Sequence, residues 1–554
     1  MDHSFSAKPA FVSEDLPKDE KDDNMLHQQQ SHEVGEIVDG VLFERTEVRQ
    51  GLHQRHIQMI ALAGAVGTGL FLGSGRAVAN AGPLGAWLGY TFVGCLIAPV
   101  VLAMGEMGTL VPLNGGVVRF AELFVDPALS FANGWNLVYS YAVSIPAEIV
   151  AAAVLVEFWV TVNNAIWITV FGILMLITAF SIVRIYGEVE FAFCTLKILL
   201  IIGVNLMALV VTCGGGPNHE SIGFRYWKHP GPFVQYLGIN GSLGRFLGFW
   251  TVFNNAIYSY SGIEAVTLVA AETANPRKVI PQATKRIFWR ILIFYVLTIF
   301  MIGLVVPSND PNLLHSTGTA AQSPFVISAS RAGIPVVSSI INAVVITSAF
   351  SSGNANLLGG ARVLYALAKN GRAPGIFTRL NRFKIPYLAV AFYGVFMALG
   401  FMTLSGSAST VFSWLQDLVS VSTLVNWIVI CITYLRFYYG CKAQNIDRKK
   451  ELPWAAPLQP WSTWIAMTFF VLLYFTGGYT TFMHHHWSTE TFVSSYINMP
   501  IVIGLYFGYK YVCKTEVIPL DKIPIRQFLE LVDVEEPKSD EPKSWKNRLD
   551  ILWS

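Results

Sequence analysis

Residues 56–75, HIQMIALAGAVGTGLFLGSG, are the stretch that decides the fold. They are apolar enough to lie in a membrane, yet four glycines, at positions 64, 67, 69 and 73, fall within ten residues. A glycine inside a helix costs about 1 kcal/mol relative to alanine, and a broken helix is tolerated at membrane depth only where it lines a cavity or packs in protein. Gly69 and Gly73 also have the spacing of a small-residue packing face, but the density of glycines around Thr68 favours a break.

A second apolar segment is interrupted in the same way at YSYSGIE, residues 258–264. The two interrupted segments are the first and the sixth apolar spans, so they take corresponding positions in successive halves of five spans. Transporters built from inverted repeats bind their substrate where two such helices meet near the membrane centre. The pair therefore predicts a transporter with its binding site at the two breaks.

Composition excludes an ordinary soluble domain. Of the 554 residues, 53% are hydrophobic and 13% are charged, the mean hydropathy is +0.48, and a soluble domain carries about 25% charged residues. A helix needs about 20 apolar residues to cross a bilayer. Twelve segments meet that length, which predicts an all-α polytopic membrane protein: 57–80, 83–111, 129–160, 164–183, 189–212, 246–271, 287–306, 337–361, 386–405, 409–435, 461–483 and 493–513.

The charged residues gather in two tails and in a few loops. Residues 1–55 are predicted to be a disordered tail, because acidic and Gln/His-rich sequence cannot bury a core, and residues 514–554 form a second polar tail. Lys and Arg are enriched in cytoplasmic loops, and the loops after the sixth, eighth and tenth spans are rich in both, so both tails are predicted to be cytosolic. The predicted parts of the transporter domain, 56–513, are a first repeat at 57–212, a second at 246–435 and two extra helices at 461–513.

Five stretches make the family recognisable. The chain resembles the yeast amino-acid transporter branch of the amino acid-polyamine-organocation superfamily over nearly all of residues 51–514. The resemblance implies a LeuT-type fold of five-plus-five inverted repeats with broken helices 1 and 6, residence in the plasma membrane, and uptake of L-amino acids with protons. The stretches that carry it are HIQMIALAGAVGTGLFLGSG from His56, GWNLVYSYAVSIPAEI from Gly134, YSYSGIEAVTLVAAETANPRKVIPQA from Tyr258, SAFSSGNANLLGGARVLYALAKNGRAPGIF from Ser348 and INMPIVIGLYFGYK from Ile497.

An amino acid brings a carboxylate and an ammonium out of water, and a broken helix can replace the hydration of each. A half-helix that starts near Gly69 offers free N–H groups and a positive end to a carboxylate. A half-helix that ends near Ser259 offers free carbonyls to an ammonium. The predicted carboxylate site is Val66, Gly67, Thr68 and Gly69, and the matching positions in the sixth span are Tyr258, Ser259, Tyr260 and Gly262. The resemblance implies that an aromatic residue at or near this break closes over the substrate, with Tyr258 and Tyr260 as the candidates; packing of the helix interface is the alternative for whichever one points away.

Ionisable residues inside apolar spans are expensive and become functional candidates by default. Glu148 follows Pro146 in the third span, and by the resemblance it corresponds to a family glutamate of the substrate cavity; a buried structural carboxyl is the alternative. Glu264 either accepts hydrogen bonds from the N–H groups freed at the second break or takes up and releases a proton. We favour the first, structural role. For Asp417 we expect a solvated position in an outer vestibule.

Lys197 lies in the middle of the fifth span, where a lipid-facing cation is not expected. The resemblance implies that this lysine replaces the sodium ion of sodium-coupled transporters with the same fold, and that it carries the proton. Ser351 and Ser352 of the eighth span are its expected neighbours. A permanently charged lysine paired with a carboxylate is the alternative.

The predicted partners are an amino-acid substrate, protons and the lipid bilayer, without nucleic acid. Lys8, Lys18 and Lys21 of the N-terminal tail are candidate ubiquitin acceptors, which is an expectation from the family alone. No cofactor or metal site is predicted, and because no Walker A, HExxH or GxSxG motif occurs, we predict no enzyme. Neutral amino acids are the favoured substrates, with a broad range of amino acids or proline-like substrates also left open; the alternatives are a carrier of basic amino acids, polyamines or choline, and an amino-acid sensor that does not transport.

Overall fold

The computed structural model describes residues 37–38, 41–42, 66–111, 116–160, 162–180, 183–217, 219–263, 276–313, 323–483 and 486–535. The chain divides into two units, residues 1–49 and 50–554. In the first unit, the described residues form two antiparallel strands, β1 (Ile37–Val38) and β2 (Val41–Leu42). The predictions for Lys8, Lys18 and Lys21 lie outside the described residues.

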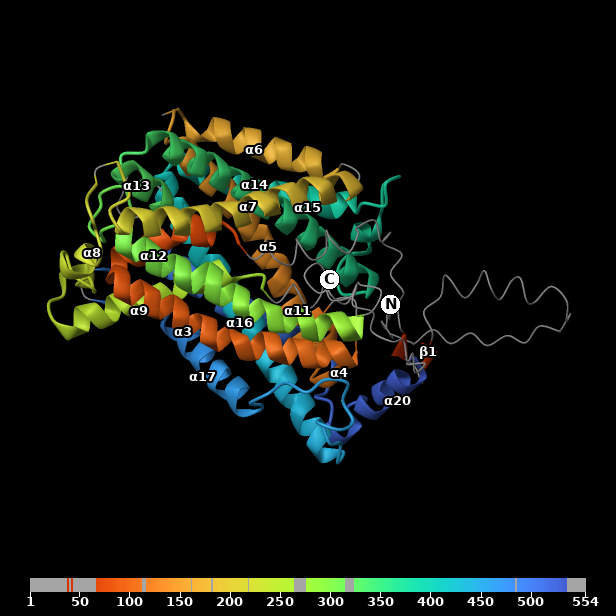
Figure 1. Cartoon of the computed structure of the whole chain (residues 1–554). Coiled ribbons are helices and arrows are strands. Elements are labelled where there is room, and N and C mark those ends of the chain that lie inside the picture. Colours follow the sequence, from red (N-terminus) through yellow and green to blue (C-terminus); the bar gives the residue numbers. More distant parts are fainter. Residues whose placement is uncertain are drawn as a thin grey trace, which may run out of the picture. The chain divides into compact units, whose positions relative to one another are not determined.

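The described part of the second unit is helical, as predicted (Figure 1). Its elements are η1 (Gly69–Gly73), α3 (Ser74–Leu110), α4 (Gly116–Phe124), α5 (Pro127–Val156), α6 (Asn164–Ala179), α7 (Val183–Thr212), α8 (Arg225–Lys228), η2 (Tyr236–Gly238), α9 (Ser242–Tyr260), α11 (Pro276–Arg290), η3 (Ile291–Leu297), α12 (Thr298–Val305), α13 (Pro324–Arg331), α14 (Pro335–Lys369), η4 (Gly375–Thr378), α15 (Tyr387–Phe396), η5 (Met397–Leu404), α16 (Ala408–Ala443), α17 (Trp461–Thr476), η6 (Tyr479–Phe482), α18 (Thr489–Tyr496), α19 (Asn498–Cys513), η7 (Leu520–Lys522) and α20 (Ile525–Glu535).

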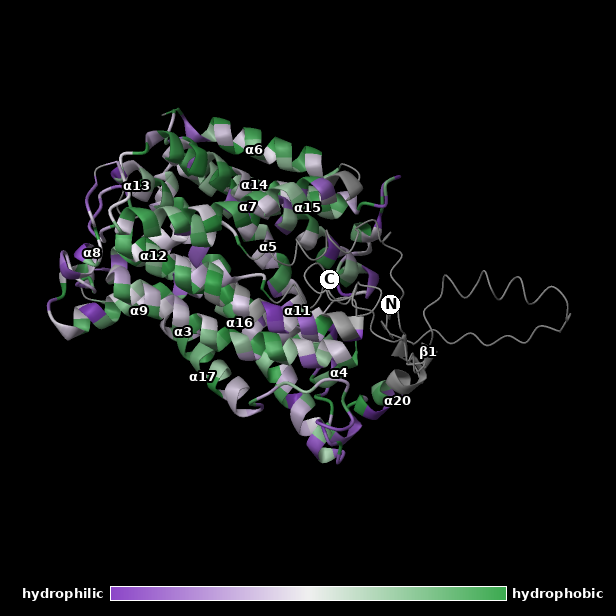
Figure 2. Cartoon of the chain, viewed as in Figure 1, coloured by the Kyte–Doolittle hydropathy of each residue, from purple (hydrophilic) through white to green (hydrophobic). Residues whose placement is uncertain are grey.

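Seven helical runs within the described residues are long and apolar enough to cross a membrane, and three shorter apolar helices accompany them. Apolar residues follow the lengths of α6, α7 and α12, whereas hydrophilic residues gather on α11 and around α8 (Figure 2). On α6, large apolar side chains such as Ile166, Ile173 and Ile177 are more than half exposed. An exposed apolar stripe along a whole helix is stable against lipid and not against water.

The boundary predicted between the first two spans falls on Gly82. η1 and α3 form one continuous run from Gly69 to Leu110, but Gly82 has φ +79° and interrupts the helical geometry immediately before Pro83. A side chain at Gly82 would come within 2.7 Å of the Pro232 carbonyl oxygen. Only glycine fits this turn, because both its φ and its close backbone neighbour exclude a Cβ atom.

Two sets of helix contacts hold the second unit together, one made by α5 and one made by α3. α5 packs against α14 and α16, and α3 packs against α9. Asp126 caps the start of α5 by accepting a hydrogen bond from Ala128 N at 2.8 Å, and Pro127 takes the first helical position, which suits it because it has no N–H to satisfy. Asp126 also forms an ion pair with Lys510 of α19 at 2.8 Å. The residue that caps α5 therefore also links α5 to α19.

The first part of the predicted C-terminal tail packs against the helical body. Ile523, Ile525 and Phe528 are buried. Gln444, just after α16, donates from Nε2 to the carbonyls of the η7 segment, at 2.7 Å for Ile523. Arg436 of α16 donates to the Ile518 carbonyl. The chain therefore stays anchored as far as Phe528, beyond the end of its last apolar helix at Cys513.

Candidate functional site

The two predicted breaks meet at Gly69. A Cβ atom at this position would lie 2.6 Å from Ser259 Cα and 2.9 Å from Tyr258 Cδ1. Real Cβ contacts essentially never fall below 3.0 Å, so only glycine lets the two segments approach this closely. The break and the packing face that the sequence left as alternatives therefore coincide at this residue.

The first break is the start of a helix. Val66 is not helical, and η1 begins at Gly69 with Thr68 as its cap residue. The N–H groups of Leu70 and Phe71 both donate to the Gly67 carbonyl, at 3.2 and 3.4 Å. The N–H groups before them have no acceptor inside the helix, and they stand at its positive end. This is the geometry that the carboxylate prediction requires.

The Thr68 hydroxyl contacts a carboxylate of α5 and a tyrosine of α9. It donates to Glu148 Oε2 at 2.9 Å, and the Tyr258 hydroxyl lies 3.3 Å from the same Thr68 oxygen. The hydroxyl hydrogen of Thr68 is therefore directed to Glu148 and not toward a substrate carboxylate. The backbone N–H groups at Gly67, Thr68 and Gly69 are left as the donors for that role, which stays a prediction.

Glu148 of α5 faces both breaks. It is 5% exposed and reaches Thr68 of the first break and the Tyr258 hydroxyl of the second, the latter at 3.5 Å. A side chain at Gly67 would come within 3.4 Å of Glu148 Oε1 and 3.1 Å of Ser352 Oγ. Gly67 thus leaves a narrow space between the carboxylate of α5 and a hydroxyl of α14.

The second break is the end of α9. The helix stops at Tyr260, Ser261 is extended, and Gly262 has φ +82°. The carbonyls that were predicted to be free have partners: Tyr258 O accepts from Ser261 N and Oγ, at 3.2 and 2.8 Å, and Ser259 O accepts from Tyr295 Oη at 3.0 Å. Buried carbonyls rarely stay unpaired, and the neighbouring side chains supply the missing donors. Glu264 lies outside the described residues.

The two tyrosines of the second break point in different directions. Tyr258 faces Thr68 and Glu148 and packs edge-on against Phe412 of α16. Tyr260 is fully buried and packs against Tyr295, with ring centroids 4.4 Å apart. Of the two tyrosines that the sequence left as candidates for covering the substrate, Tyr258 is the one that faces Glu148, and the covering role stays a prediction.

The Ser259 side chain is turned away from Glu148. Its hydroxyl donates to the Asn255 carbonyl at 2.9 Å and lies 2.9 Å from the Tyr90 hydroxyl. These contacts hold the last turn of α9 against α3. Ser259 therefore takes part in the break through its backbone and not through its side chain.

Lys197 is completely buried in α7. Its Nζ donates to Ser352 Oγ at 3.4 Å, and it is close enough to Glu148 for a direct electrostatic interaction. Ser351, the other expected neighbour, instead donates to Glu190 Oε1 at 2.7 Å. Ser352 therefore stands between Lys197 on one side and Gly67 of the first break on the other.

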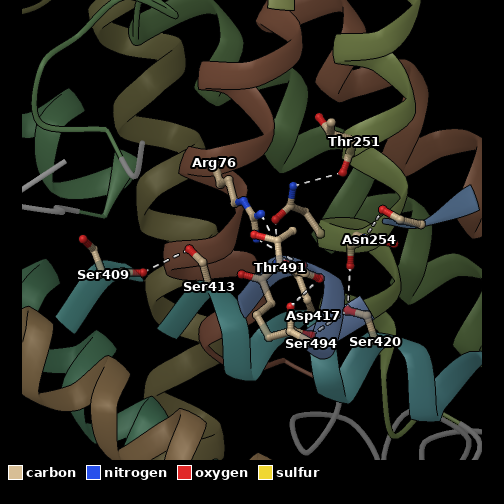
Figure 3. A network of polar contacts seen from close by, with 12 residues as sticks. Arg76, Thr251, Asn254, Ser409, Ser413, Asp417, Ser420, Thr491 and Ser494 are labelled. Atoms are coloured by element: carbon tan, nitrogen blue, oxygen red, sulfur yellow. Dashed lines mark hydrogen bonds and ion pairs between the residues drawn. The ribbon is translucent and has the colours of Figure 1, made fainter. Parts of the chain in front are cut away.

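Asp417 of α16 is not solvated, contrary to our expectation. It is 3% exposed and forms an ion pair with Arg76 of α3 at 3.1 Å. Figure 3 shows Arg76 pointing toward Asp417, with serine hydroxyls of α16 nearby. A carboxylate that is buried without a partner is expensive, and Arg76 supplies that partner for Asp417.

Among the charged groups that the sequence did not single out are the buried Glu106 and Glu190 and the partly buried Arg76. Each interrupts an apolar stretch, so the same argument that found Lys197 would have found them. Glu106 of α3 pairs with Arg448 at 2.6 Å and accepts from Tyr434 Oη at 2.6 Å. That cluster links α3 to the end of α16, and it contains no residue of the two breaks.

Residues 56–519 match the family model described as "Amino acid permease". The chain belongs to the amino acid permease family. The permease is 38% identical to the dicarboxylic amino acid permease of Saccharomyces cerevisiae over 89% of this chain and 82% of that protein. It is 37% identical to the proline-specific permease of Emericella nidulans, over 92% and 94%, and 35% identical to the lysine-specific permease of S. cerevisiae, over 93% and 85%.

Among solved structures, the permease is similar to a mutant of the manganese transporter of Eremococcus coleocola. The TM-score is 0.52 at 13% identity, and the match covers 90% of this chain and 98% of that chain. An identity this low supports the fold alone. The permease is therefore a multi-pass membrane protein of a transporter family and not an enzyme.

Proposed function

We propose that the permease imports L-amino acids across the plasma membrane together with protons, by alternating access, with both termini in the cytosol. In this proposal it has twelve membrane helices, of which the first ten form the two inverted repeats of a LeuT-type fold. The substrate is held between the start of η1 and the end of α9. The favoured substrates are neutral amino acids.

One observation carries the proton-coupling part of the proposal: Lys197 is completely buried and contacts Ser352, which in turn borders Gly67. A lysine ammonium is a compact cation with three donors, and unlike a metal ion it can release a proton. In its charged form it can hold α7, α14 and the first break together. Loss of the proton would remove that link and permit the helices to move.

The substrate carboxylate is expected at the N–H groups of Gly67, Thr68 and Gly69, because they stand at the positive end of a helix. The substrate ammonium is expected beside Glu148 and the Tyr258 hydroxyl, because a buried cation needs a charged or polar partner. Glu148 is the acidic group that the described contacts place at both breaks. Glu148 would then bind the α-ammonium of the substrate. It would not be available to a charged substrate side chain, which favours a neutral amino acid.

The relatives show why family membership leaves the side chain open. Their names specify dicarboxylic, proline and lysine substrates, which differ in charge and shape while sharing the α-amino acid group. The backbone donors at the first break fit that shared group. The side-chain preference of this permease is the part of the proposal that a competition panel must decide.

The test is accumulation of a labelled amino acid in proteoliposomes under a pH gradient, together with the proton influx that the substrate induces. Lys197→Ala should reduce accumulation at least tenfold, whereas Lys228→Ala, an exposed lysine of α8, should not. Twenty unlabelled amino acids and their decarboxylated analogues then compete for uptake. Wild-type accumulation in Lys197→Ala refutes the coupling role, and inhibition by the decarboxylated analogues refutes the carboxylate site.

A further inference from the structure

Glu190 is a buried carboxyl group that the proposed function does not yet use. It lies on α7 and is 2% exposed. Two donors reach its Oε1 atom: the Ser351 hydroxyl at 2.7 Å and the Cys194 thiol at 3.6 Å. In the described part of the chain no cation forms an ion pair with it. An ionisable group buried at this depth is expensive, so Glu190 is a functional candidate.

Glu190 and Lys197 approach α14 at adjacent residues. They are seven positions apart on α7, which is about two helical turns or about 10 Å along the helix axis. Glu190 contacts Ser351, and Lys197 contacts Ser352, the next residue of α14. The two ionisable groups are therefore connected to one short hydroxyl-bearing segment, although they do not contact each other directly.

The order of the two groups along α7 matters. With the N-terminus in the cytosol, as the proposed function has it, α7 starts on the cytosolic side at Val183. Glu190 then lies between Lys197 and the cytosol. A proton that leaves Lys197 toward the cytosol would meet Glu190 on its way.

We propose that Glu190 is the inner proton acceptor of the transport cycle. The Lys197 ammonium releases a proton and becomes a neutral amine. The Glu190 carboxylate takes up that proton through the hydroxyls of Ser352 and Ser351, or a water beside them, and becomes a neutral carboxylic acid. In a second step Glu190 passes the proton to water on the cytosolic side and becomes a carboxylate again.

Charge balance favours this route. Before the first transfer the two groups carry opposite charges, and after it both are neutral, so their sum is zero at both times. A transfer from Lys197 to an isolated neutral acceptor would instead move a bare positive charge through a medium where unpaired charges cost several kcal/mol.

Among the described side chains, few competing groups lie near Glu190. On α7 they are Cys194 and the exposed Glu188, and on α5 Glu148 lies on the far side of Ser352. α12, which packs against α7, has no titratable side chain in its range Thr298–Val305, and the single one of α13, Arg331, pairs with Asp310. Glu190 is thus the acidic group next to Ser351, and Glu148 is the one next to Gly67.

The test uses Glu190→Gln, which keeps the size and the hydrogen-bond acceptor but cannot take up a proton. Two activities are measured in proteoliposomes of the full chain: exchange of labelled for unlabelled amino acid without a pH gradient, and accumulation driven by a pH gradient. Exchange needs no net proton release, so we expect it within about twofold of wild type. Accumulation and substrate-induced proton influx should fall at least tenfold. Glu188→Gln, two residues away and exposed, is the matched control and should leave both activities unchanged.

The inference rests on the proposed function, and the outcomes separate the two. If the wild-type protein shows no proton-driven accumulation, the proposed function fails. If the wild type accumulates substrate and Glu190→Gln does so equally well, only the role of Glu190 fails. Loss of exchange together with accumulation also overturns it, because Glu190 would then hold α7 to α14 without a role in proton transfer.

Two further variants decide the matter if Glu190→Gln does not fold. Glu190→Asp keeps a titratable group and should retain proton-driven accumulation at a reduced rate. Ser351→Ala removes the hydroxyl that links the carboxylate to α14 and should lower accumulation more than exchange. Equal effects on accumulation and exchange in both variants would refute the proposal.

Discussion

Replacement of Gly69 by alanine tests whether the two breaks work as one site. The new Cβ atom would lie 2.6 Å from Ser259 Cα, which is 0.8 Å short of the 3.4 Å at which ordinary van der Waals contact begins. The obstructing atom is backbone, so it cannot rotate away as the end of a flexible side chain could. η1 and the end of α9 would have to separate.

Overpacking of this kind costs about 1–3 kcal/mol. If the cost falls on the conformation in which the breaks are in contact, it shifts the balance between conformations by about 5- to 150-fold. A transport cycle must pass through each of its conformations in turn, so we expect the maximal rate of uptake by Gly69→Ala to fall by at least fivefold. Gly73→Ala is the matched control, because its Cβ atom would meet Gln416 no closer than 3.5 Å.

The assay is initial uptake of labelled amino acid by transport-deficient yeast cells, normalised to the amount of protein at the cell surface. We expect a strong loss in Gly69→Ala and a rate within about twofold of wild type in Gly73→Ala. Equal rates in the two variants would show that the close approach of the breaks has no part in transport, and the placement of the substrate there would be refuted.

Three more predictions concern named contacts. Tyr258→Phe removes the hydroxyl beside Thr68 and Glu148 and should raise the KM about fivefold, as expected for a hydrogen bond of about 1 kcal/mol; an unchanged KM would remove Tyr258 from the site. Asp417→Asn leaves Arg76, whose side chain is 17% exposed, without its partner and should cost about 3 kcal/mol, the low end for a buried pair because Arg76 is only partly buried, seen as a lower melting temperature in detergent, whereas the double variant Arg76→Met/Asp417→Leu should recover much of it. Burial acts to raise the pKa of Asp126, but the hydrogen bonds from Lys510 and Ala128 outweigh it and lower that pKa below its usual value. Their stabilisation is therefore present above about pH 4, where an unfolded Asp is charged, and is lost as the pH falls through the lowered value; Lys510→Met should be less stable than wild type at pH 7, and a difference that persists undiminished at pH 3 would contradict this.

Apolar segment length predicted the helical class and most helix positions, because a bilayer requires long uninterrupted apolar runs. The predicted span 409–435 lies inside α16, and 337–361 lies inside α14. The number of twelve spans and the repeat symmetry stay part of the proposal. The gap between the predicted spans 57–80 and 83–111 coincides with the interruption at Gly82, where glycine and proline adjoin.

The candidate site was harder to predict in detail. The glycine pattern located both breaks, but the choice between Tyr258 and Tyr260 depends on the rotation of α9, which the sequence does not specify. The burial of Asp417 depends on Arg76, a residue 341 positions away, and no local pattern connects the two. The carbonyls of Tyr258 and Ser259 were expected to be free, and their partners Ser261 and Tyr295 could be recognised only once the helices were packed.

The anchored segment after α19 has a practical consequence for reporter fusions. Three apolar side chains, Ile523, Ile525 and Phe528, are buried there, and each contributes about 1.5–3 kcal/mol when fully buried. A fluorescent protein attached beyond Glu535 leaves these contacts in place, whereas one that replaces the chain after Lys514 removes all three. Fluorescence from the second fusion would then report a destabilised protein, and its surface abundance would say little about the intact permease.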